Sequence, residues 1–414
     1  MIQTALLQRA RGLLAWPVLL ALPLALPLGP AGFGLLTQIA TAWLLLLSIG
    51  LLHARLGLLS FGQALFFGLA AYAAAHAMNA IAAHGWPLPF VLVPLYGGLF
   101  AAAVALLAGP LCVRRGGLSF AMITLGLGVL MALLAPMLQG FFGGEGGVAT
   151  DRTAGPVWLG IDLLSQRQVY AVSAAYVLLG AALLRGFDAT RLALLACAVR
   201  DNPLRAAASG IAPRTVRLQL LLFSACLAGI SGALQTLRIE QASAGSLGLQ
   251  QSSMALLFSL AAGCGTVWGA LLGAGMMVGA EVLLAAVSRA WMLYVGLGFL
   301  AIVIWAPQGL SAVLRDLTRQ LRAARDPDLL WGLAALLVCA ALAAIGLSTL
   351  VELVYAVRQQ LQIGSNVRLY GLQLTPHRAD AWVGAALLSA TGLALAAPVA
   401  RAFARQLRAS AVLR

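Results

Sequence analysis

The side chains that could carry acid–base, nucleophilic or metal chemistry are few in this chain and lie far apart. The histidines, His53, His76, His84 and His377, show no HxxxH or HxxE spacing, and no two of the five cysteines are spaced as metal ligands. Between residues 30 and 140 there is no Asp or Glu at all. An enzyme needs a nucleophile, an acid and a base that converge, or a metal ion. The sequence therefore predicts neither a catalytic site nor a metal site, which argues against a membrane-bound enzyme.

The chain contains no lysine, so every one of its basic side chains is an arginine. A P-loop (GxxxxGKS or GxxxxGKT) requires lysine, and ATP hydrolysis by that fold must therefore come from another polypeptide. Only one acid, Glu281, falls inside an apolar run, whereas ion-coupled carriers usually keep ionisable groups in mid-membrane. These features favour a passage for solute that is driven by a separate energy source. The alternative is an ion-coupled secondary transporter of small solutes.

The composition predicts a membrane protein. Hydrophobic residues make up 62% of the chain and charged residues 9%, against roughly 25% charged in soluble domains. The apolar runs last about 17–25 residues and do not alternate, which predicts spanning helices. We therefore expect an all-α polytopic helical bundle, with about ten core spans plus a two-span C-terminal hairpin. The expected spans are 13–29, 34–52, 57–79, 88–112, 117–140, 168–185, 214–237, 246–264, 267–286, 290–306, 329–350 and 381–400.

The distribution of arginine predicts the orientation of these spans. The net charge of +14 comes from arginines between the spans, where the positive-inside rule puts them, and does not indicate nucleic-acid binding. With the N-terminus inside, most arginines lie in inner segments, so both termini are expected in the cytoplasm. The basic segments 185–217 and 307–328 are both expected on the cytoplasmic side. An even number of membrane crossings must therefore lie between them. Four crossings fit, and the break at residues 263–269 predicts two short spans or a re-entrant pair.

Residues 185–217 form the most polar segment in the middle of the chain, with arginine at positions 185, 191, 200, 205, 214 and 217. Asp201, Asn202 and Pro203 are typical of a helix start, and Gly210 of a helix stop. The result would be a short helix at the membrane surface with a small Ala/Gly face suited to docking by another protein. The alternative is a basic loop that only fixes topology. The candidate docking residues are Arg200, Asp201, Asn202, Pro203, Arg205, Ala206, Ala207 and Gly210.

Two further groups of residues are candidates for contact with solute or a partner. Polar and glycine positions in the expected third and fifth spans could line a path, or could simply permit close helix packing. These candidates are Ser60, Gly62, Gln63, Gly68, Thr124 and Gly126. In the outer loop 141–167, Gly144, Glu145 and Gly146 could hold a ligand or partner, or form a flexible turn. Residues 311–325 predict an amphipathic helix on the inner leaflet.

Six segments in chain order resemble the inner-membrane permeases of branched-chain amino-acid ABC importers, specifically the Liv-type M subunit family. They are LSFGQALFFG at 59–68 with Ala71 and Tyr72, GLSFAMITLG at 117–126, GGEG at 143–146, RDNPLRAAASGI at 200–211, GCGTVWG at 263–269 and PQGL at 307–310. The resemblance implies a type II importer fold of about ten spans per subunit. It also implies that residues 200–211 match the coupling segment that sits in a groove of the ATPase.

The same resemblance implies partners and a location. The expected partners are two cytoplasmic ABC ATPases, a second homologous permease, a periplasmic solute-binding protein and the lipid bilayer of a bacterial inner membrane, with no nucleic acid. No cofactor is expected on this chain, since ATP and Mg²⁺ would bind the partner ATPase. Arg205 stands where the family often has Glu, and Ala270 where it has Pro. Related permeases carry urea, amides or other amino acids, which leaves the substrate open.

The resemblance also predicts a division of the chain. Residues 1–310 would form the importer permease domain, and residues 311–328 a cytoplasmic amphipathic linker. Residues 329–414 would form an extra C-terminal transmembrane hairpin and a basic tail, since the family usually ends near residue 320.

Overall fold

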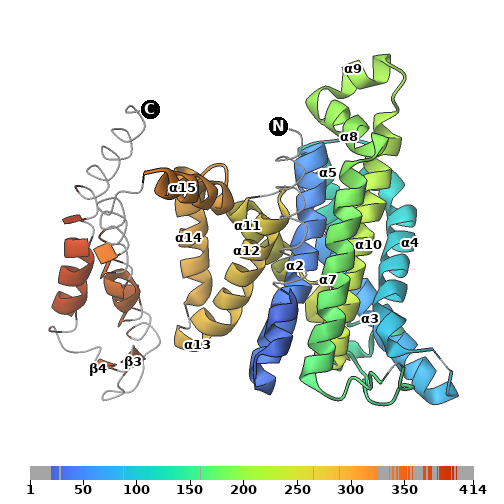
Figure 1. Cartoon of the computed structure of the whole chain (residues 1–414), viewed down its shortest axis with the longest axis horizontal. Coiled ribbons are helices and arrows are strands. Elements are labelled where there is room, and N and C mark those ends of the chain that lie inside the picture. Colours follow the sequence, from blue (N-terminus) through green and yellow to red (C-terminus); the bar gives the residue numbers. More distant parts are fainter. Residues whose placement is uncertain are drawn as a thin grey trace. The chain divides into compact units, whose positions relative to one another are not determined.

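The computed structural model describes residues 20–27, 29–86, 88–158, 160–263, 265–288 and 290–324, together with scattered residues between 335 and 398. The chain divides into two compact units, Met1–Val278 and Gly279–Arg414. Each is almost wholly helical in its described part (Figure 1). This agrees with the predicted all-α class.

The first unit is a bundle of long helices with two short strands. Its elements are α2 (Pro30–Leu56), α3 (Gln63–His84), η1 (Phe90–Leu92), α4 (Val93–Cys112), α5 (Leu118–Leu134), α6 (Gln139–Phe142), η2 (Gly144–Gly146), β1 (Val148–Ala149), α7 (Gln166–Asp188), α8 (Arg191–Asp201), α9 (Pro203–Ala208), α10 (Pro213–Ile239), β2 (Gln241–Ala242), η3 (Ala244–Leu247), α11 (Leu249–Ala262) and most of α12 (Val267–Gly279). Strands β1 and β2 pair antiparallel.

Helix α10 is the centre of this unit and packs against α2, α3 and α4. Small residues let these helices approach closely, as is usual in membrane bundles. A Cβ added at Gly229 would lie 2.4 Å from the Cβ of Ala101 in α4. One added at Gly232 would lie 2.0 Å from the carbonyl oxygen of Phe67 in α3. The glycines of α10 therefore fix the distances between these helices.

Six helices of the described chain are long and apolar enough to cross a membrane, or eight if two bent pairs each count as one span. The six are Pro30–Leu56, Gln63–His84, Phe90–Cys112, Gln166–Asp188, Pro213–Ile239 and Val267–Leu284. The bent pairs are Leu118–Leu134 with Gln139–Gly146, and Trp291–Trp305 with Leu310–Thr318. The predicted spans 13–29, 329–350 and 381–400 lie partly outside the described residues; of their described parts, residues 20–25 are helical and Trp382–Gly392 is a short apolar helix. The protein is thus a multi-pass α-helical membrane protein.

The predicted span 57–79 begins six residues late, at Gln63. Gly57 adopts a left-handed conformation (φ 65°) and ends α2, with its N–H donating to the carbonyl of His53. The chain from Gly57 to Gly62 is not helical, and the side chains of Leu58 and Ser60 are buried. This connection re-enters the bundle before α3 starts. Hydropathy alone did not reveal it, because an apolar buried connection and an apolar helix have similar compositions.

The predicted span 246–264 is also shorter than expected. Helix α11 has 14 residues and is about 21 Å long, which is too short for a hydrocarbon core of about 30 Å. The preceding residues 241–248 are extended or 3-10 helical and complete the passage through the bundle. A short helix before the break at residues 263–266 is one of the two forms predicted for this region.

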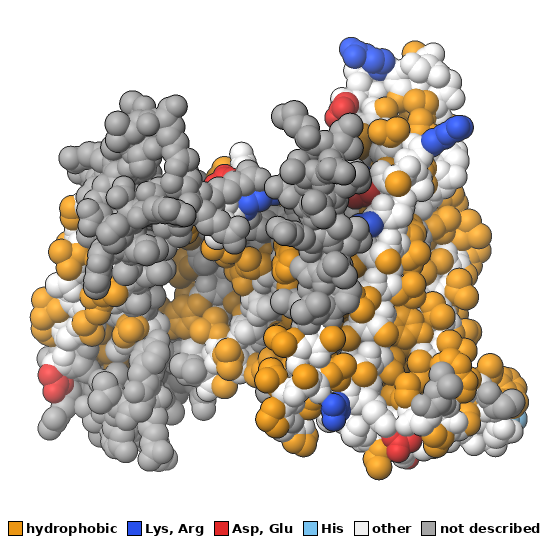
Figure 2. Space-filling view, viewed as in Figure 1, with side chains coloured by type: hydrophobic (Ala, Val, Ile, Leu, Met, Phe, Trp, Pro, Cys, Tyr) orange, Lys and Arg blue, Asp and Glu red, His pale blue; other side chains and the backbone are white. Residues whose placement is uncertain are grey.

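Charged and apolar side chains are separated along the first unit. Figure 2 shows hydrophobic side chains over the middle of this unit, with Arg, Asp and Glu towards its two ends. One end holds α8, α9 and the end of α2, and we call it the α9 end. The other holds β1, β2 and the start of α7, and we call it the hairpin end. This distribution is that of a bundle whose middle faces lipid.

The second unit contains the π-helical turn η4 (Ala280–Leu284), α13 (Ala285–Val287), α14 (Trp291–Trp305), α15 (Leu310–Ala324) and the antiparallel strands β3 (Val367–Leu369) and β4 (Leu372–Leu374). Glu281 lies in the π turn. The helix predicted over residues 311–325 is confirmed as α15, and Leu310, Leu314 and Leu317 share one of its faces.

Candidate functional site

The segment predicted to start a helix at residues 201–203 does so through a side-chain cap. Asn202 ends α8 and begins α9, and its Oδ1 accepts hydrogen bonds from the backbone N–H of Leu204 (3.1 Å) and Arg205 (3.0 Å). Pro203 occupies the first turn, where a missing N–H costs nothing. The short helix therefore forms where the local sequence predicts it.

The predicted stop at Gly210 is also confirmed. Gly210 has φ 81°, its N–H donates to the carbonyl of Ala207, and the N–H of Ile211 donates to the carbonyl of Ala206, each at 3.0 Å. This pair of bonds is the Schellman motif, in which a left-handed residue satisfies the last carbonyls of a helix. The six residues of α9 are thus capped at both ends.

Helix α9 projects beyond the ends of the long helices of the first unit (Figure 1). Asp201, Pro203 and Ala207 are exposed, as are Arg205 and Gly210, whereas Ala206 faces the protein with 5% of its surface exposed. Leu204, which the prediction left out, is 82% exposed. The free face of α9 is thus more apolar than a small Ala/Gly face, with arginine beside it.

Two arginines fasten this projecting segment to the end of α2. Arg200, in the last turn of α8, donates from Nη1 to the carbonyl oxygen of Ala54 at 2.6 Å. Arg55 forms an ion pair with Asp188 at the end of α7. An arginine at a helix C-terminus satisfies free carbonyls and interacts favourably with the helix dipole. The α7–α8–α9 segment is therefore fastened to the last turn of α2 at two points.

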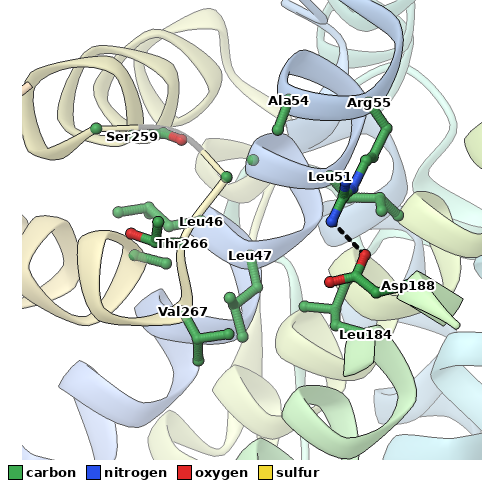
Figure 3. Close-up of a pocket in the computed structure, with 14 residues that line it drawn as sticks. Leu46, Leu47, Leu51, Ala54, Arg55, Leu184, Asp188, Ser259, Thr266 and Val267 are labelled. Atoms are coloured by element: carbon green, nitrogen blue, oxygen red, sulfur yellow. Dashed lines mark hydrogen bonds and ion pairs between the residues drawn. The ribbon is translucent and has the colours of Figure 1, made fainter. Parts of the chain in front are cut away.

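A small cavity of about 50 Å³ lies next to these contacts. Figure 3 shows it between α2, the end of α7 and the break that joins α11 to α12, with Arg55 pointing to Asp188 at its edge. The break packs tightly on α2, since a Cβ added at Gly265 would lie 2.7 Å from the Cβ of Ala54. The same turn of α2 thus contacts both the projecting segment and the break.

The predicted path residues Ser60 and Gln63 lie together in a buried hydrogen-bond network. Gln63 Nε2 donates to Ser48 Oγ in α2 (3.0 Å) and to Ser224 Oγ in α10 (2.6 Å), and Gln63 Oε1 accepts from Ser60 Oγ (3.2 Å). The backbone N–H of Ala64 donates to Ser252 Oγ in α11 at 2.9 Å. Gln63 has no exposed surface. In this structure its amide joins helices rather than facing an open path.

Replacing Gln63 with leucine should destabilise the protein by about 1–3 kcal/mol, because a buried hydroxyl would lose its partner. The matched control is Gln250→Leu, because Gln250 is exposed on α11 outside this network and should leave the midpoint nearly unchanged. The midpoint of thermal unfolding in detergent would measure both variants. An unchanged midpoint for Gln63→Leu combined with altered uptake would contradict the packing role and support a role in the solute path.

The other predicted path residues occupy two different surroundings. Gly62 packs on α5, where an added Cβ would lie 2.4 Å from the carbonyl oxygen of Thr124, and Thr124 Oγ1 donates within its own helix. Gly68 packs on η3, where a Cβ would lie 2.7 Å from the Leu247 side chain. Gly126 is exposed and has open space beside it. The assignment of these residues to a path stays a prediction.

The predicted outer-loop residues form a compact turn at the hairpin end. Gly144, Glu145 and Gly146 make up η2, and the carbonyl of Gly146 accepts a bond from Gln241 Nε2 at 2.7 Å. Glu145 is exposed at this turn. The following strand β1 pairs with β2, so this loop is tied to the end of α10. Its role in ligand or partner binding stays a prediction.

Polar contacts continue beyond β1. Arg152 forms an ion pair with Glu240 at 3.0 Å. Asp151 accepts bonds from the hydroxyl and the N–H of Thr153, at 2.7 and 2.8 Å, and these bonds lower the pKa of its carboxyl. In the part of the chain that the structure describes, no three His, Cys, Asp or Glu side chains gather as metal ligands.

Sequence reasoning missed the partners that give these sites their geometry. Ser48 and Ser224 are hidden in apolar runs, and their partner Gln63 lies 161 residues from Ser224. Arg55 and Asp188 lie 133 residues apart. The one available signal was that Arg55 and Asp188 both fall at the predicted inner ends of spans.

The bundle and its projecting helix define a multi-pass helical membrane protein. A family described as "Branched-chain amino acid transport system / permease component" matches residues 32–306. The chain belongs to this family, which confirms the resemblance drawn from the motifs, five of which fall inside the matched range. No solved structure matches this chain.

Two curated relatives carry the name "High-affinity branched-chain amino acid transport system permease protein LivM". The protein from Escherichia coli (strain K12) is 25% identical over 285 residues, which cover 63% of this chain and 65% of the relative. The protein from Salmonella typhimurium (strain LT2) is 25% identical over 283 residues, with the same coverage. The chain therefore spans 65% of the length of these curated relatives.

Proposed function

We propose that this chain is the transmembrane permease subunit of an ATP-driven importer for branched-chain or related amino acids. Its membership of the permease family supports the class of substrate. The absence of lysine supports a separate ATPase, since a P-loop cannot be built here. The observation that carries the proposal is the doubly capped helix α9, which projects from the bundle and exposes Leu204 and Arg205.

In this proposal, residues 200–211 dock in a cytoplasmic ATPase and transmit its motion to the bundle. The contacts Arg200–Ala54 and Arg55–Asp188 support this role, because a displaced α9 would pull on the last turn of α2. That turn also packs on the break at Gly265. Movement of the ATPase could therefore reach α11 and α12 through α2.

The remaining partners follow from the family assignment. Two ATPases that bind ATP and Mg²⁺, a second homologous permease and a periplasmic solute-binding protein would complete the importer. The chain would lie in a bacterial inner membrane with both termini in the cytoplasm. The arginines of α8 and α9 support this orientation under the positive-inside rule.

The energy source tests the proposal. In proteoliposomes that hold the permease with its partner proteins and an internal ATP-regenerating system, amino-acid uptake should continue when an uncoupler collapses the ion gradients. It should stop when ATP is removed, because the chain has few ionisable groups with which to bind a coupling ion. Uptake that persists without ATP and fails with the uncoupler, together with an inactive Glu281→Gln variant, would instead support an ion-coupled carrier.

A further inference from the structure

A second cavity lies inside the first unit, away from the α9 end. It measures about 140 Å³, close to the roughly 150 Å³ of a protein cavity known to hold benzene. Its apolar side is made by Phe67 and Ala71 of α3. Its polar side is made by Gln235 at the end of α10, Gln241 and Ser243 of the following segment, and Gln251 in the first turn of α11.

The depth of this cavity follows from the contacts of α3. Gln63, the first residue of α3, forms a hydrogen bond with Ser48 of α2. Along the axis of α2, Ser48 lies roughly 12 Å from the end of the helix at Leu56. Gly68, in the second turn of α3, packs directly on Leu247, roughly 8 Å further into the bundle. Since α2 is about 40 Å long, Leu247 lies beside its middle. The cavity extends from Phe67 and Ala71 near this level to Gln241 and Ala242 of β2 at the hairpin end.

The backbone around the cavity is not helical at this depth. Residues 241–248 run from the hairpin end to mid-bundle before α11 starts. In a membrane, such backbone is tolerated only where it is buried in protein or lines a water-filled space. Broken helices at mid-membrane are also where transporters bind their solutes. The inner end of the cavity therefore has the position of a site on a solute path, and its outer end opens towards the hairpin end.

The lining supplies hydrogen-bonding groups and no charge. Gln241 Nε2 donates to the carbonyl of Gly146, and Gln235 Oε1 accepts from Arg238 Nε. Among the described residues, Gln241 Oε1 and Gln235 Nε2 have no hydrogen-bond partner. Gln251 and Ser243 form no side-chain hydrogen bond with another described residue. The acid that follows α10, Glu240, is paired with Arg152. No charged side chain lines the cavity, and the nearest guanidinium, of Arg238, is bonded to Gln235, so a solute with net charge would lose hydration without a charged lining group to replace it.

We propose that this cavity is a solute-binding site on the transport path and takes small polar solutes of zero net charge, namely neutral amino acids or simple amides. Amide and hydroxyl groups recognise their donors and acceptors, and Phe67 and Ala71 contact their apolar part. The site rests on the proposed function for its place in transport, but the binding that it predicts can be measured without ATP.

Protection of a cysteine tests binding directly. In membranes that contain the full chain and its partners, Ser243→Cys should react with N-ethylmaleimide. Saturating valine (zero net charge) or isobutyramide (a neutral amide of similar size) should slow the reaction at least about threefold. Valinamide, a cation of the same size, should not. Ser165→Cys, exposed at the start of α7 and outside the cavity lining, is the control that should react without protection. The unsubstituted chain gives the background from its own cysteines.

Protection by valine alone would identify an amino-acid site, and protection by isobutyramide alone an amide site. Equal protection by all three solutes, or by none, would overturn the proposal. Failure of the proposed function would appear differently, as protection at Ser243→Cys without any ATP-dependent uptake.

Uptake gives an independent test with a closely matched pair of variants. Gln251→Glu places a carboxylate in the cavity and should lower uptake of the neutral solute at least about tenfold. The carboxylate would hold water in the space that the solute needs, because a buried charge must stay solvated. Gln250→Glu changes the neighbouring glutamine, which is exposed and does not line the cavity, and should leave uptake near that of the wild type. Equal uptake by the two variants would contradict the site.

Discussion

Replacing Gly210 with arginine should lower ATP-dependent uptake at least about tenfold while the protein still inserts into the membrane. Gly210 has φ 81°, a conformation that costs an L-residue about 1–2 kcal/mol. The strain would fray a helix of six residues that depends on Gly210 for its C-terminal cap. The arginine would also add a bulky cation to the face that we propose as the ATPase contact. Uptake and the amount of protein in the membrane are the two measurements.

Gly186→Arg is the matched control for this prediction. Gly186 lies at the same end of the molecule, in α7, is exposed and has open space beside it, but its conformation is helical. Arginine there should leave uptake within about twofold of the wild type, since arginine is a better helix former than glycine. If Gly210→Arg transported normally, the coupling assignment would fail. If both variants lost uptake equally, added charge rather than the α9 surface would be the cause.

A third substitution separates conformation from surface. Asparagine tolerates the left-handed region better than other non-glycine residues, so Gly210→Asn should retain the cap. It should therefore keep most of the uptake that Gly210→Arg loses. Equal losses in the two variants would indicate that any side chain at this point prevents docking.

Local features of the α9 end could be predicted because each depends on neighbouring residues. The N-terminal cap at Asn202 and the helix stop at Gly210 involve partners within five residues. Asparagine and glycine are residue types typical of these two positions. The exposure of Leu204 could not be predicted in this way. It depends on which face of α9 turns towards the protein, and that follows from the packing of α9 on α8 and α10, which buries Ala206.

The interior of the bundle was predicted less completely for a related reason. Ser60 and Gln63 are polar residues in an apolar run, which fits either a path or a packed network. The choice depends on whether Ser48 and Ser224 lie opposite, and periodicity carries no information on that. The late start of α3 and the short α11 have the same origin. Both segments are apolar enough to span, and the local sequence does not show that Gly62 packs on Thr124 or that Gly68 packs on Leu247 beside the non-helical chain.

Replacing Gly232 with alanine should destabilise the protein by about 3 kcal/mol, near the upper end for overpacking in a core. The added Cβ would lie 2.0 Å from the carbonyl oxygen of Phe67 and 2.8 Å from its carbonyl carbon. Both atoms belong to the backbone of α3, so no rotamer change can relieve the contact. Helices α3 and α10 would have to separate. That movement would also disturb the Gln63–Ser224 bond, which lies between the same two helices.

Gly126→Ala is the control, because Gly126 also lies inside a helix but has nothing within 4 Å of the added Cβ. It should be neutral or stabilise the protein by about 0.5–1 kcal/mol, since alanine loses less conformational entropy than glycine in a helix. Thermal unfolding of both variants in detergent would measure the difference. Similar midpoints would mean that the α3–α10 contact can relax, and that close glycine packing does not fix this bundle. A normal midpoint with reduced uptake in Gly126→Ala would instead favour its predicted place on the solute path.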